Sequence, residues 1–353
     1  MAVETSAVAG VCSRLLGRRV VAVERLAGGR NSQVFRIDCE AGPPPDCFVA
    51  KQYFAVPEDS RDRLRTEFRA LEFLKAHGVG NVPSAIAVDP ETHTAIYERV
   101  AGERATAQSI SGADIHSAID FLLVLRRLSE AGDARSLPAA SEACFSMDGI
   151  FKSLSGRVAR LRSLPDDAMG IAALRRFLDE RFDPFVADLT AWAGEQATRH
   201  GIERHREIRA EERTLSPSDF GFHNALRDAG GRLVFVDFEY FGWDDPAKTA
   251  ADFLLHPAMD LSVELKRRFA EGLVSGLPAC GQLKQRARVV YPLFGLKWCL
   301  ILLNEFVPED LRRRGFAGAA DADRSDLLRS QLQRAEQLLD RIAAEYRQNP
   351  YFD

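Results

Sequence analysis

The sequence of 353 residues lacks a basic excess and lacks long apolar runs. Lys and Arg number 47 against 51 Asp and Glu, and the formal net charge of -4 favours neither nucleic acid nor an anionic membrane as a partner. The most apolar stretches, such as residues 121–125 and 299–303, are far shorter than the roughly 20 residues that a membrane helix needs. We therefore predict a soluble protein that binds no nucleic acid and no membrane.

Paired cysteine motifs and a signal peptide are missing as well. No Cys-x-x-Cys pair occurs among Cys12, Cys39, Cys47, Cys144, Cys280 and Cys299, which argues against a zinc site and against a disulfide framework. The N-terminus carries Glu4 and no basic stretch followed by an apolar core. We expect reduced thiols in a cytoplasmic chain.

What is present is a globular composition, 46% hydrophobic and 28% charged, on a chain long enough for two cores. The first part is rich in Val, Phe and Ile, and it is interrupted by glycine and proline segments that cannot continue a strand ladder. This pattern predicts a small antiparallel sheet with one helix. The expected strands are residues 20–26, 33–39, 47–54, 84–88 and 94–99, and the expected helix is residues 59–77.

After Gly102 the pattern changes to long amphipathic helices, expected over residues 114–130, 172–200 and 324–348. One exception is a loop over residues 215–226, which is followed by a β-rich run over residues 232–238. The chain is therefore predicted to be an α+β protein. Its domains are a sheet-rich lobe of residues 1–100 and a mostly helical lobe of residues 101–353.

A glycine pair stands between the first two expected strands. The loop Gly28, Gly29, Arg30, Asn31 and Ser32 can fold its backbone amides over a phosphate, because glycine leaves no side chain in the way. A plain hairpin turn is the alternative interpretation.

A lysine and a glutamate follow in the same lobe. Lys51, in an apolar strand, can contact phosphates while its aliphatic stem packs on the sheet. Glu67, in the first half of the next helix, is a natural counterion for it. A solvent-facing lysine and an exposed helix glutamate are the plainer alternatives.

The segment from Ser216 to Tyr240 carries the most specific signal. Asp219, Asn224 five positions later and Asp237 at the end of an apolar run supply a base and two metal ligands in the spacing that kinases use. An amide and a carboxylate oxygen are hard ligands suited to Mg²⁺. A turn at Asp219 and a strand-end aspartate would explain each residue singly but not the joint spacing.

With these pieces the sequence resembles the superfamily of aminoglycoside phosphotransferases and choline/ethanolamine kinases, relatives of the protein kinases. The resemblance covers most of the chain. It implies a two-lobed protein-kinase-like fold that binds ATP, or GTP as the alternative nucleotide, together with Mg²⁺ between the lobes. It also implies a connecting hinge over residues 97–101, including Glu98 and Val100, that meets the base of the nucleotide.

The resemblance further implies a role for each matching residue. Asp219 is the catalytic base, Asn224 and Asp237 bind Mg²⁺, and Lys51 contacts the α and β phosphates. Asp252 is similar to a family aspartate that hydrogen-bonds the catalytic loop from below. Asp245 is expected to cap a helix that begins with proline.

The sequence departs from the family in three places. Pro217 and Ser218 replace the usual His-Gly or His-Asn before the catalytic aspartate, so another group must brace that loop. Glu239 stands two residues after Asp237 and becomes a candidate for a second metal ligand. The segment after it is short, which disfavours a protein substrate. His223, inside the catalytic loop, is expected to face solvent or to pack.

Two tryptophans in the helical lobe are candidates for the acceptor site. Trp243 and Trp298 could form part of an aromatic cage for an ammonium group or stack on a sugar, and core packing is the alternative for Trp298. The neighbouring Lys297 would suit an anionic or sugar acceptor. We order sugar-like hydroxyl compounds first and amino alcohols second.

The predicted function is a small-molecule kinase that transfers the γ-phosphoryl group of ATP to a hydroxyl of a metabolite, an aminoglycoside-like compound included. The alternative is a kinase-like module that binds a nucleotide or a partner without chemistry. The pattern leaves the oligomeric state open.

Overall fold

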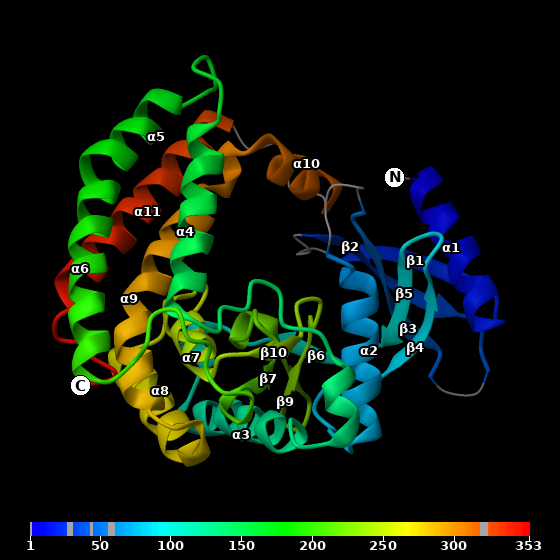
Figure 1. Cartoon of the computed structure of the whole chain (residues 1–353). Helices are drawn as coiled ribbons and strands as arrows, with labels where there is room; N and C mark the ends of the chain where they lie inside the picture. The colour runs from blue at the N-terminus through cyan, green and yellow to red at the C-terminus, as the bar shows by residue number, and fades with distance from the viewer. Residues whose placement is uncertain (1, 27–30, 43–44, 56–60, 318–323) are drawn as a thin grey trace. The chain divides into compact units, whose positions relative to one another are not determined.

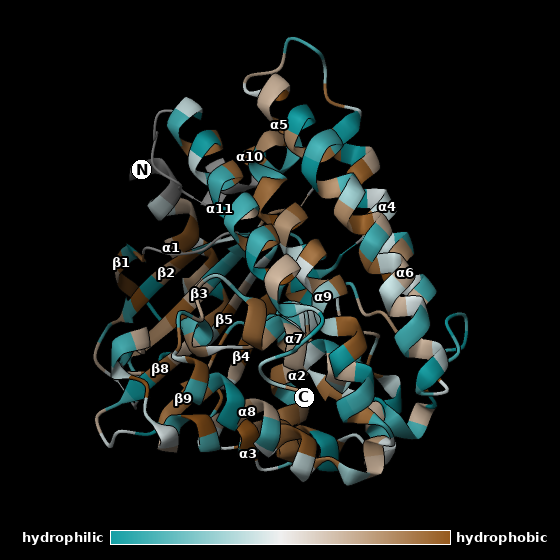
Figure 2. Cartoon of the chain, turned by 90° about the vertical axis from the view of Figure 1, so that its left-hand side faces the viewer, coloured by the Kyte–Doolittle hydropathy of each residue, from teal (hydrophilic) through white to brown (hydrophobic). Residues whose placement is uncertain are grey.

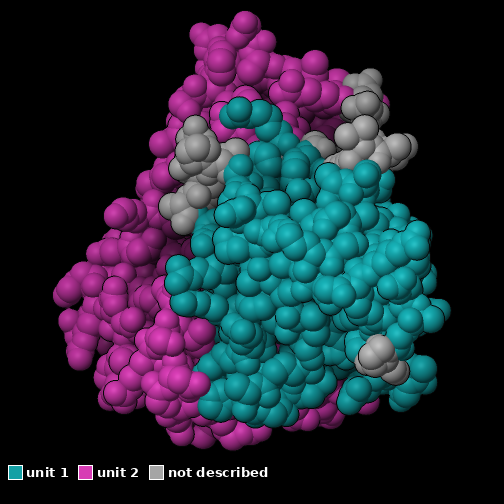
Figure 3. Space-filling model, turned by 90° about the vertical axis from the view of Figure 1, so that its right-hand side faces the viewer, with its two compact units in different colours: residues 1–105, 224–241, 312–320 teal, residues 106–223, 242–311, 321–353 magenta. Residues whose placement is uncertain are grey.

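The computed structural model describes residues 2–26, 31–42, 45–55, 61–317 and 324–353. The chain divides into two compact units, each assembled from three stretches of sequence (Figure 3). Unit 1 comprises residues 1–105, 224–241 and 312–320, and unit 2 comprises residues 106–223, 242–311 and 321–353. The division predicted near residue 100 lies close to the first of these boundaries, and two later stretches of chain join the N-terminal part.

Unit 1 is built on a five-stranded antiparallel sheet with the strand order β1-β2-β3-β5-β4. The five strands agree with those expected from the β-rich runs and their turn-forming interruptions. Their bounds are β1 (Val20–Leu26), β2 (Ser32–Cys39), β3 (Cys47–Tyr53), β4 (Ala85–Asp89) and β5 (Thr94–Glu98).

A helix on each side gives this sheet its two environments. Val8 and Cys12 of α1 (Ala2–Leu16) pack with Phe35, Phe48 and Ala50 in the core of one face. Alternation along β3 turns the side chains between these core positions to the other face, where α2 (Arg63–Ala76) contacts the sheet. The sequence analysis predicted α2 but missed α1.

A second, three-stranded sheet completes unit 1 in the order β6-β8-β9. It joins β6 (Gly102–Arg104) to the later strands β8 (Ala225–Asp228) and β9 (Leu233–Phe235). Gly102 is required there, because a Cβ at this position would lie 2.6 Å from the carbonyl oxygen of Arg227. This pairing brings the segment that ends in Asp237 into the same unit as the N-terminal sheet.

Unit 2 is mostly helical, and α9 occupies its centre. Figure 1 shows α4, α6, α9 and α11 side by side, and Figure 2 shows hydrophilic and hydrophobic residues mixed along α4, α6 and α11, as expected for amphipathic helices. The helices with residues in this unit are α3 (Gly112–Leu128), α4 (Met147–Arg162), α5 (Ile171–Phe177), α6 (Asp183–Arg199), α7 (Pro246–Leu255), α8 (Val263–Gly276), α9 (Leu283–Leu302), α10 (Pro308–Ala317) and α11 (Arg324–Glu345). The residues of α10 from 312 onward belong to unit 1.

Helix α9 is apolar because it is a core helix. The stretch Leu283–Phe306 is long and apolar enough to cross a membrane by length and composition, but 78% of that window is buried inside the structure. Close packing against α11 requires Gly295, where a Cβ would lie 2.6 Å from Ile342. The burial of α9 is that of a core helix.

A two-stranded ladder in unit 2 positions the loop that carries Asp219 and the start of α7. Strand β7 (Thr214–Ser216) pairs antiparallel with β10 (Gly242–Asp244), with Ser216 opposite Gly242. A Cβ on Gly242 would lie 2.4 Å from the carbonyl oxygen of Pro138, so this close approach needs glycine. The loop that carries Asp219 follows β7, and α7 follows β10.

Candidate active site

Lys51 lies at the centre of a polar cluster in unit 1. Its Nζ donates to Glu67 Oε1 and to Asp237 Oδ1, each at 2.8 Å. Burial disfavours the charged ammonium, but the carboxylates of Asp237 and Glu67 outweigh it and raise the pKa of Lys51 well above its ordinary value. Lys51 is therefore a fixed cation held by two acidic side chains.

Asp237 and Asn224 are linked through the backbone. The Val236 N–H donates to the carbonyl oxygen of Asn224 at 2.9 Å, which holds the chain after β9 beside the start of β8. Asp237 has a φ of 71°, in the left-handed region where a residue other than glycine is strained. Its side chain is 36% exposed, so a ligand in solution can reach the carboxylate.

Glu239 lies buried two residues further on. Asn31 Nδ2 donates to Glu239 Oε1 at 2.5 Å and to the hydroxyl of Tyr240 at 2.7 Å. Burial and the charge of Asp237 raise the pKa of Glu239 to about 8. Asn31, at the end of the predicted phosphate loop, is thus held by the turn that follows β9.

The acidic residues of this cluster fit a magnesium ion. One carboxylate oxygen from each of Glu67, Asp237 and Glu239 lies within 4.8 Å of the others. Magnesium prefers oxygen ligands of this kind and usually takes only one or two carboxylates from the protein. Glu239 is buried beside Asp237, and both raise its pKa; a divalent cation bound at this cluster would favour its charged form.

The remaining residues predicted to bind the nucleotide are placed as follows. Ser32 begins β2 and is buried, and Val100 follows β5. Glu98 ends β5 and accepts hydrogen bonds from the backbone and hydroxyl of Ser84 at 3.0 and 2.7 Å, so its carboxylate is engaged within the sheet. Two of the predicted residues lie outside the described residues, Gly28 and Gly29.

In unit 2, serines brace the loop that carries Asp219. The Ser218 N–H donates to Ser216 Oγ at 3.0 Å, and the Ser218 hydroxyl donates to the carbonyl oxygen of Ser141 at 3.1 Å. Ser218 has a φ of 66°, also in the left-handed region. The side chain of Asp219 itself is 34% exposed. Ser216 and Ser218 thus brace the segment where the family pattern has histidine.

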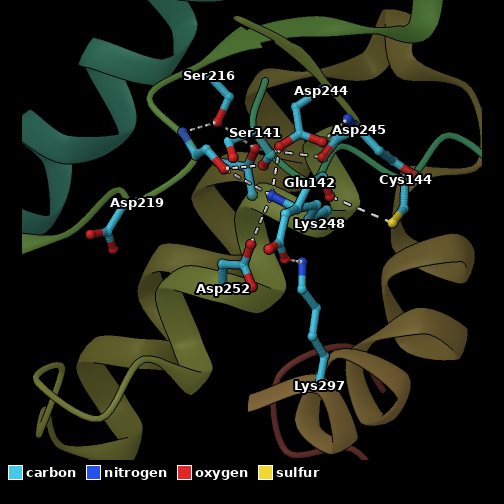
Figure 4. Close-up of polar contacts among 12 residues, drawn as sticks. Ser141, Glu142, Cys144, Ser216, Asp219, Asp244, Asp245, Lys248, Asp252 and Lys297 are labelled. Atoms are coloured by element: carbon cyan, nitrogen blue, oxygen red, sulfur yellow. Dashed lines mark hydrogen bonds and ion pairs between the residues drawn. The ribbon is translucent and has the colours of Figure 1, made fainter. Parts of the chain in front are cut away.

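A buried lysine supports this loop from α7 (Figure 4). Lys248 Nζ donates to Asp244 Oδ2 at 2.7 Å and to Ser218 Oγ at 3.2 Å, and it pairs with Asp252 Oδ2 at 3.0 Å. Burial disfavours the charged form, but Asp244 and Asp252 outweigh it and raise the pKa of Lys248. Asp252, expected beneath the catalytic loop, contacts Ser218 through this lysine.

Asp245 has the capping role expected of it. Its carboxylate accepts the Ala247 N–H at 2.8 Å at the start of α7, and Pro246 takes the first helical position. Arg286 of α9 also pairs with Asp245 at 2.9 Å, so the cap ties α7 to the central helix.

Two histidines contact or approach Asp219. His223 Nε2 lies 3.0 Å from Asp219 Oδ1, and His256 Nε2 lies 3.6 Å from the same oxygen. The two imidazole rings stack with their centroids 3.8 Å apart and their planes 2° from parallel. His223 was expected to face solvent or to pack; its ring stacks on His256, and its Nε2 also lies within hydrogen-bond distance of the aspartate.

The candidate acceptor tryptophans both donate hydrogen bonds within unit 2. Trp298 Nε1 donates to Asp252 Oδ1 at 2.9 Å, and its ring meets His256 edge-to-face at a centroid distance of 4.7 Å. Trp243 Nε1 donates to the carbonyl oxygen of Ala134 at 3.0 Å. Both side chains are half-buried, so Trp298 is neither a wholly buried core residue nor an isolated surface ring.

Lys297 is buried and paired with Glu142. Its Nζ lies 3.0 Å from Glu142 Oε2, and Arg157 pairs with the same carboxylate (Figure 4 shows the lysine). Although burial acts in the opposite direction, Lys297 and Arg157 lower the pKa of Glu142. The suggestion that Lys297 binds an anionic acceptor is therefore not supported, because its ammonium group is already paired with the carboxylate of Glu142.

A sequence model described as the phosphotransferase enzyme family matches residues 22–283, about three quarters of the chain. The chain belongs to the phosphotransferase enzyme family. This membership confirms the resemblance to aminoglycoside phosphotransferases and choline/ethanolamine kinases and supports small-molecule kinase activity over a non-catalytic module. No curated protein matches the sequence.

Solved structures of phosphotransferases share the fold at low identity. A spectinomycin phosphotransferase in complex with ADP and spectinomycin superposes with a TM-score of 0.61 at 11% identity, over 94% of this chain and 98% of that one. The choline kinase LicA from Streptococcus pneumoniae gives 0.59 at 15% identity, over 97% and 100%. An ethanolamine kinase from Plasmodium vivax gives 0.55 at 14%, over 89% and 81%. The predicted two-lobed, kinase-like α+β fold class is confirmed.

Sequence reasoning missed two residues that contact the catalytic loop or its aspartate. Lys248 had a signal, since Asp244, Lys248 and Asp252 are spaced four apart; Lys248 and Asp252 lie on one face of α7, and Asp244 ends β10. His256 had none, because it lies 37 positions from Asp219 in an otherwise unremarkable helix end.

Proposed function

We propose that this phosphotransferase moves the γ-phosphoryl group of ATP, with Mg²⁺, to a hydroxyl group of a small molecule. Asp219 is the general base, Asn224 and Asp237 bind the metal, and Lys51 contacts the α and β phosphates. Glu239 is the candidate second ligand. When bound, the magnesium ion neutralises charge on the phosphates.

The contact of Lys51 with both Glu67 and Asp237 is the observation that carries this proposal. A lysine fixed by an acidic helix residue and by a strand-end aspartate is what phosphoryl transfer requires, because the ammonium must stay extended toward the phosphates. A module that only binds a partner has no need for a buried cation between two carboxylates, whose desolvation costs several kcal/mol per ion.

The reaction needs little covalent chemistry from the protein. The acceptor hydroxyl donates its hydrogen bond to the carboxylate of Asp219, which directs an oxygen lone pair at the γ-phosphorus. A new oxygen–phosphorus bond forms while the bond from the γ-phosphorus to the β–γ bridging oxygen breaks. The hydroxyl proton passes to Asp219, and ADP leaves with the bridging oxygen. The products are a phosphate monoester, ADP and a proton.

Asp219→Asn tests this proposal. The amide keeps the size of the side chain and cannot accept the proton, so turnover is expected to fall roughly 10²- to 10⁴-fold while ATP affinity is retained. ADP release measures turnover, and calorimetry with a non-hydrolysable ATP analogue measures affinity. The exposed Asp188→Asn on α6 is the matched control. Near-normal turnover by Asp219→Asn would remove this residue from the chemistry.

Sugar-like hydroxyl compounds stand first as acceptors and amino alcohols second. The small number of aromatic candidates, Trp243 and Trp298, supports this order, since an ammonium cage needs several aromatic faces around one cation. A screen of sugars, aminoglycosides and amino alcohols by ADP release tests it. We also place the chain in the cytoplasm, because all six cysteines are free thiols.

A further inference from the structure

We propose that His223 and His256 are positioning residues that together fix the carboxylate of Asp219. They would do the work that the family assigns to the histidine before the catalytic aspartate, which this chain lacks. The inference rests on the proposed role of Asp219 as general base.

Both imidazole rings approach the same carboxylate oxygen of Asp219. His223 Nε2 lies 3.0 Å from Asp219 Oδ1, within hydrogen-bond distance, and His256 Nε2 lies 3.6 Å from the same atom. The second distance is too long for a hydrogen bond in this state, and hydrogen bonds around a catalytic group often tighten only when substrate binds. Both rings therefore act on the Oδ1 side of a carboxylate that remains 34% exposed.

The hydrogen bonds of each ring indicate its tautomer. The Ala258 N–H donates to His256 Nδ1 at 3.1 Å, so this nitrogen is unprotonated in the neutral ring and Nε2 carries the hydrogen. His223 Nδ1 is buried with no hydrogen-bond partner in the described part of the chain. A proton there would be costly, so it too belongs on Nε2. The Nε2–H group of His223 is then the donor to Asp219.

The stacked arrangement of the rings excludes a metal ion shared by Asp219, His223 and His256. Ligand atoms of Asp219, His223 and His256 lie within 4.8 Å of one another, as a metal site would require. However, an imidazole binds a metal in the plane of its ring, and these two planes are parallel and stacked. An ion in the plane of one ring would lie well outside the plane of the other. The stacked rings instead suit one donor supported by its neighbour.

Neighbouring residues hold each histidine ring in place. Trp298 meets His256 edge-to-face and is itself anchored by its hydrogen bond to Asp252. Gly221 lies so close to the other ring that a Cβ there would be 2.7 Å from His223 Nδ1. His256 therefore holds the face of His223, and His223 donates to the aspartate. Trp298 acts on Asp219 through this stack.

The experiment pairs a disruptive with a conservative variant at each histidine. His223→Gln keeps a donor near the Nε2 position, whereas His223→Asn withdraws it. His256→Phe keeps a flat ring against His223, whereas His256→Ala removes it. Turnover is the magnesium-dependent release of ADP from ATP, with the best acceptor of the screen or with water if none is found. The exposed His205→Asn is the control.

We expect His223→Asn and His256→Ala to lower kcat about 10- to 100-fold, the effect of a misplaced catalytic group, with the KM for ATP and the melting temperature little changed. His223→Gln and His256→Phe should recover most of the lost rate. Rates within twofold of wild type for both disruptive variants would overturn the proposal, as would conservative variants no faster than the disruptive ones. If His256→Ala does not fold, the His223 pair decides.

Asp219→Asn in the same assay separates the two proposals. If Asp219→Asn is slow and the histidine variants are not, the positioning role fails and the base stands. If Asp219→Asn turns over like the wild type, the base assignment fails first.

Discussion

At the scale of single residues, two largely buried lysines of this phosphotransferase are stabilised by carboxylates rather than by water. Lys51 faces two carboxylates in unit 1, and Lys248 faces two in unit 2. A buried ion so surrounded is kept in one protonation state and one position. The consequence is that removal of one partner affects several others.

Asp237→Ala is predicted to abolish the magnesium dependence of ATP binding. The carboxylate is the proposed metal ligand, and without it the metal cannot bridge protein and phosphates. Calorimetric titration of a non-hydrolysable ATP analogue with and without Mg²⁺ measures the effect, and the exposed Asp46→Ala in the same unit is the control. An unchanged magnesium dependence would take Asp237 out of the metal site.

Lys248→Met is predicted to destabilise the folded chain by roughly 3–5 kcal/mol, because it leaves two buried carboxylates without their cation. Asp244, whose pKa burial already raises, would then bind a proton still more readily in the folded state than in the unfolded chain. Stability from such a group is present at low pH and lost as the pH rises through the folded pKa. The deficit measured by urea unfolding should therefore be smaller at pH 5 than at pH 8; a deficit that grows toward low pH would contradict this.

Residues whose spacing is local could be proposed from the sequence. Asp219, Asn224 and Asp237 lie within 19 positions, and their joint pattern is specific to the roles proposed for them. The role proposed for His223 could not be predicted from local spacing, since it depends on a ring 33 positions away. The brace by Ser218 and Lys248 depends on a positive φ and on burial, neither of which side-chain pattern alone determines.

At the scale of elements, α8 carries an unusual buried charge. Lys266 is almost fully buried, and burial together with the nearby Arg341 lowers its pKa to about 8, although Asp260 and Glu345 act in the opposite direction. A lysine whose folded pKa lies below its unfolded value opposes folding while it is protonated. Its contribution to stability is present above the unfolded pKa near 10.5 and is lost as the pH falls through 8.

Lys266→Met is accordingly predicted to stabilise the chain at pH 7, by about 3 kcal/mol at most. The advantage should shrink between pH 8 and pH 10.5, where the wild-type lysine loses its proton in the folded state before it does so in the unfolded chain. Urea unfolding at several pH values measures the difference. Lys152→Met on α4 replaces an exposed lysine and should show no such trend. A constant difference across this range would argue against the lowered pKa.

Elements were predictable where their own periodicity is strong. The strands of the first sheet and the helices α2, α3 and α11 follow from alternation or from an apolar stripe. Helix α1 was missed because its small apolar residues form no clear stripe until they pack on the sheet. Strands β6 and β8 are short and take their structure from pairing across more than a hundred residues of chain.

At the scale of the whole molecule, the order of the chain and the order of the units differ. Unit 1 gathers its three-stranded sheet and Asp237 from a segment that follows most of the helical sequence. Local patterns cannot reveal such an assembly, because each stretch looks complete by itself. The family match was needed to show that the pieces belong to one enzyme.

A fragment of residues 1–105 is therefore predicted not to fold cooperatively. It keeps the five-stranded sheet but loses the partners of β6 and the Asp237 carboxylate that faces Lys51. Circular dichroism during heating and amide hydrogen exchange measure the outcome, with the full chain as reference. A sharp transition near that of the full chain would show that the N-terminal part is autonomous.

The left-handed backbone at Ser218 and Asp237 has a consequence for laboratory evolution. Each strained residue costs of the order of 1 kcal/mol or more, which a glycine at the same place would avoid. A selection for heat resistance alone would thus favour glycine at both positions. Each such variant would lose either the Ser218 hydroxyl that braces the Asp219 loop or the Asp237 carboxylate that we propose as a metal ligand. Libraries screened only by melting temperature should accumulate robust but inactive proteins here, so activity must be selected in the same round.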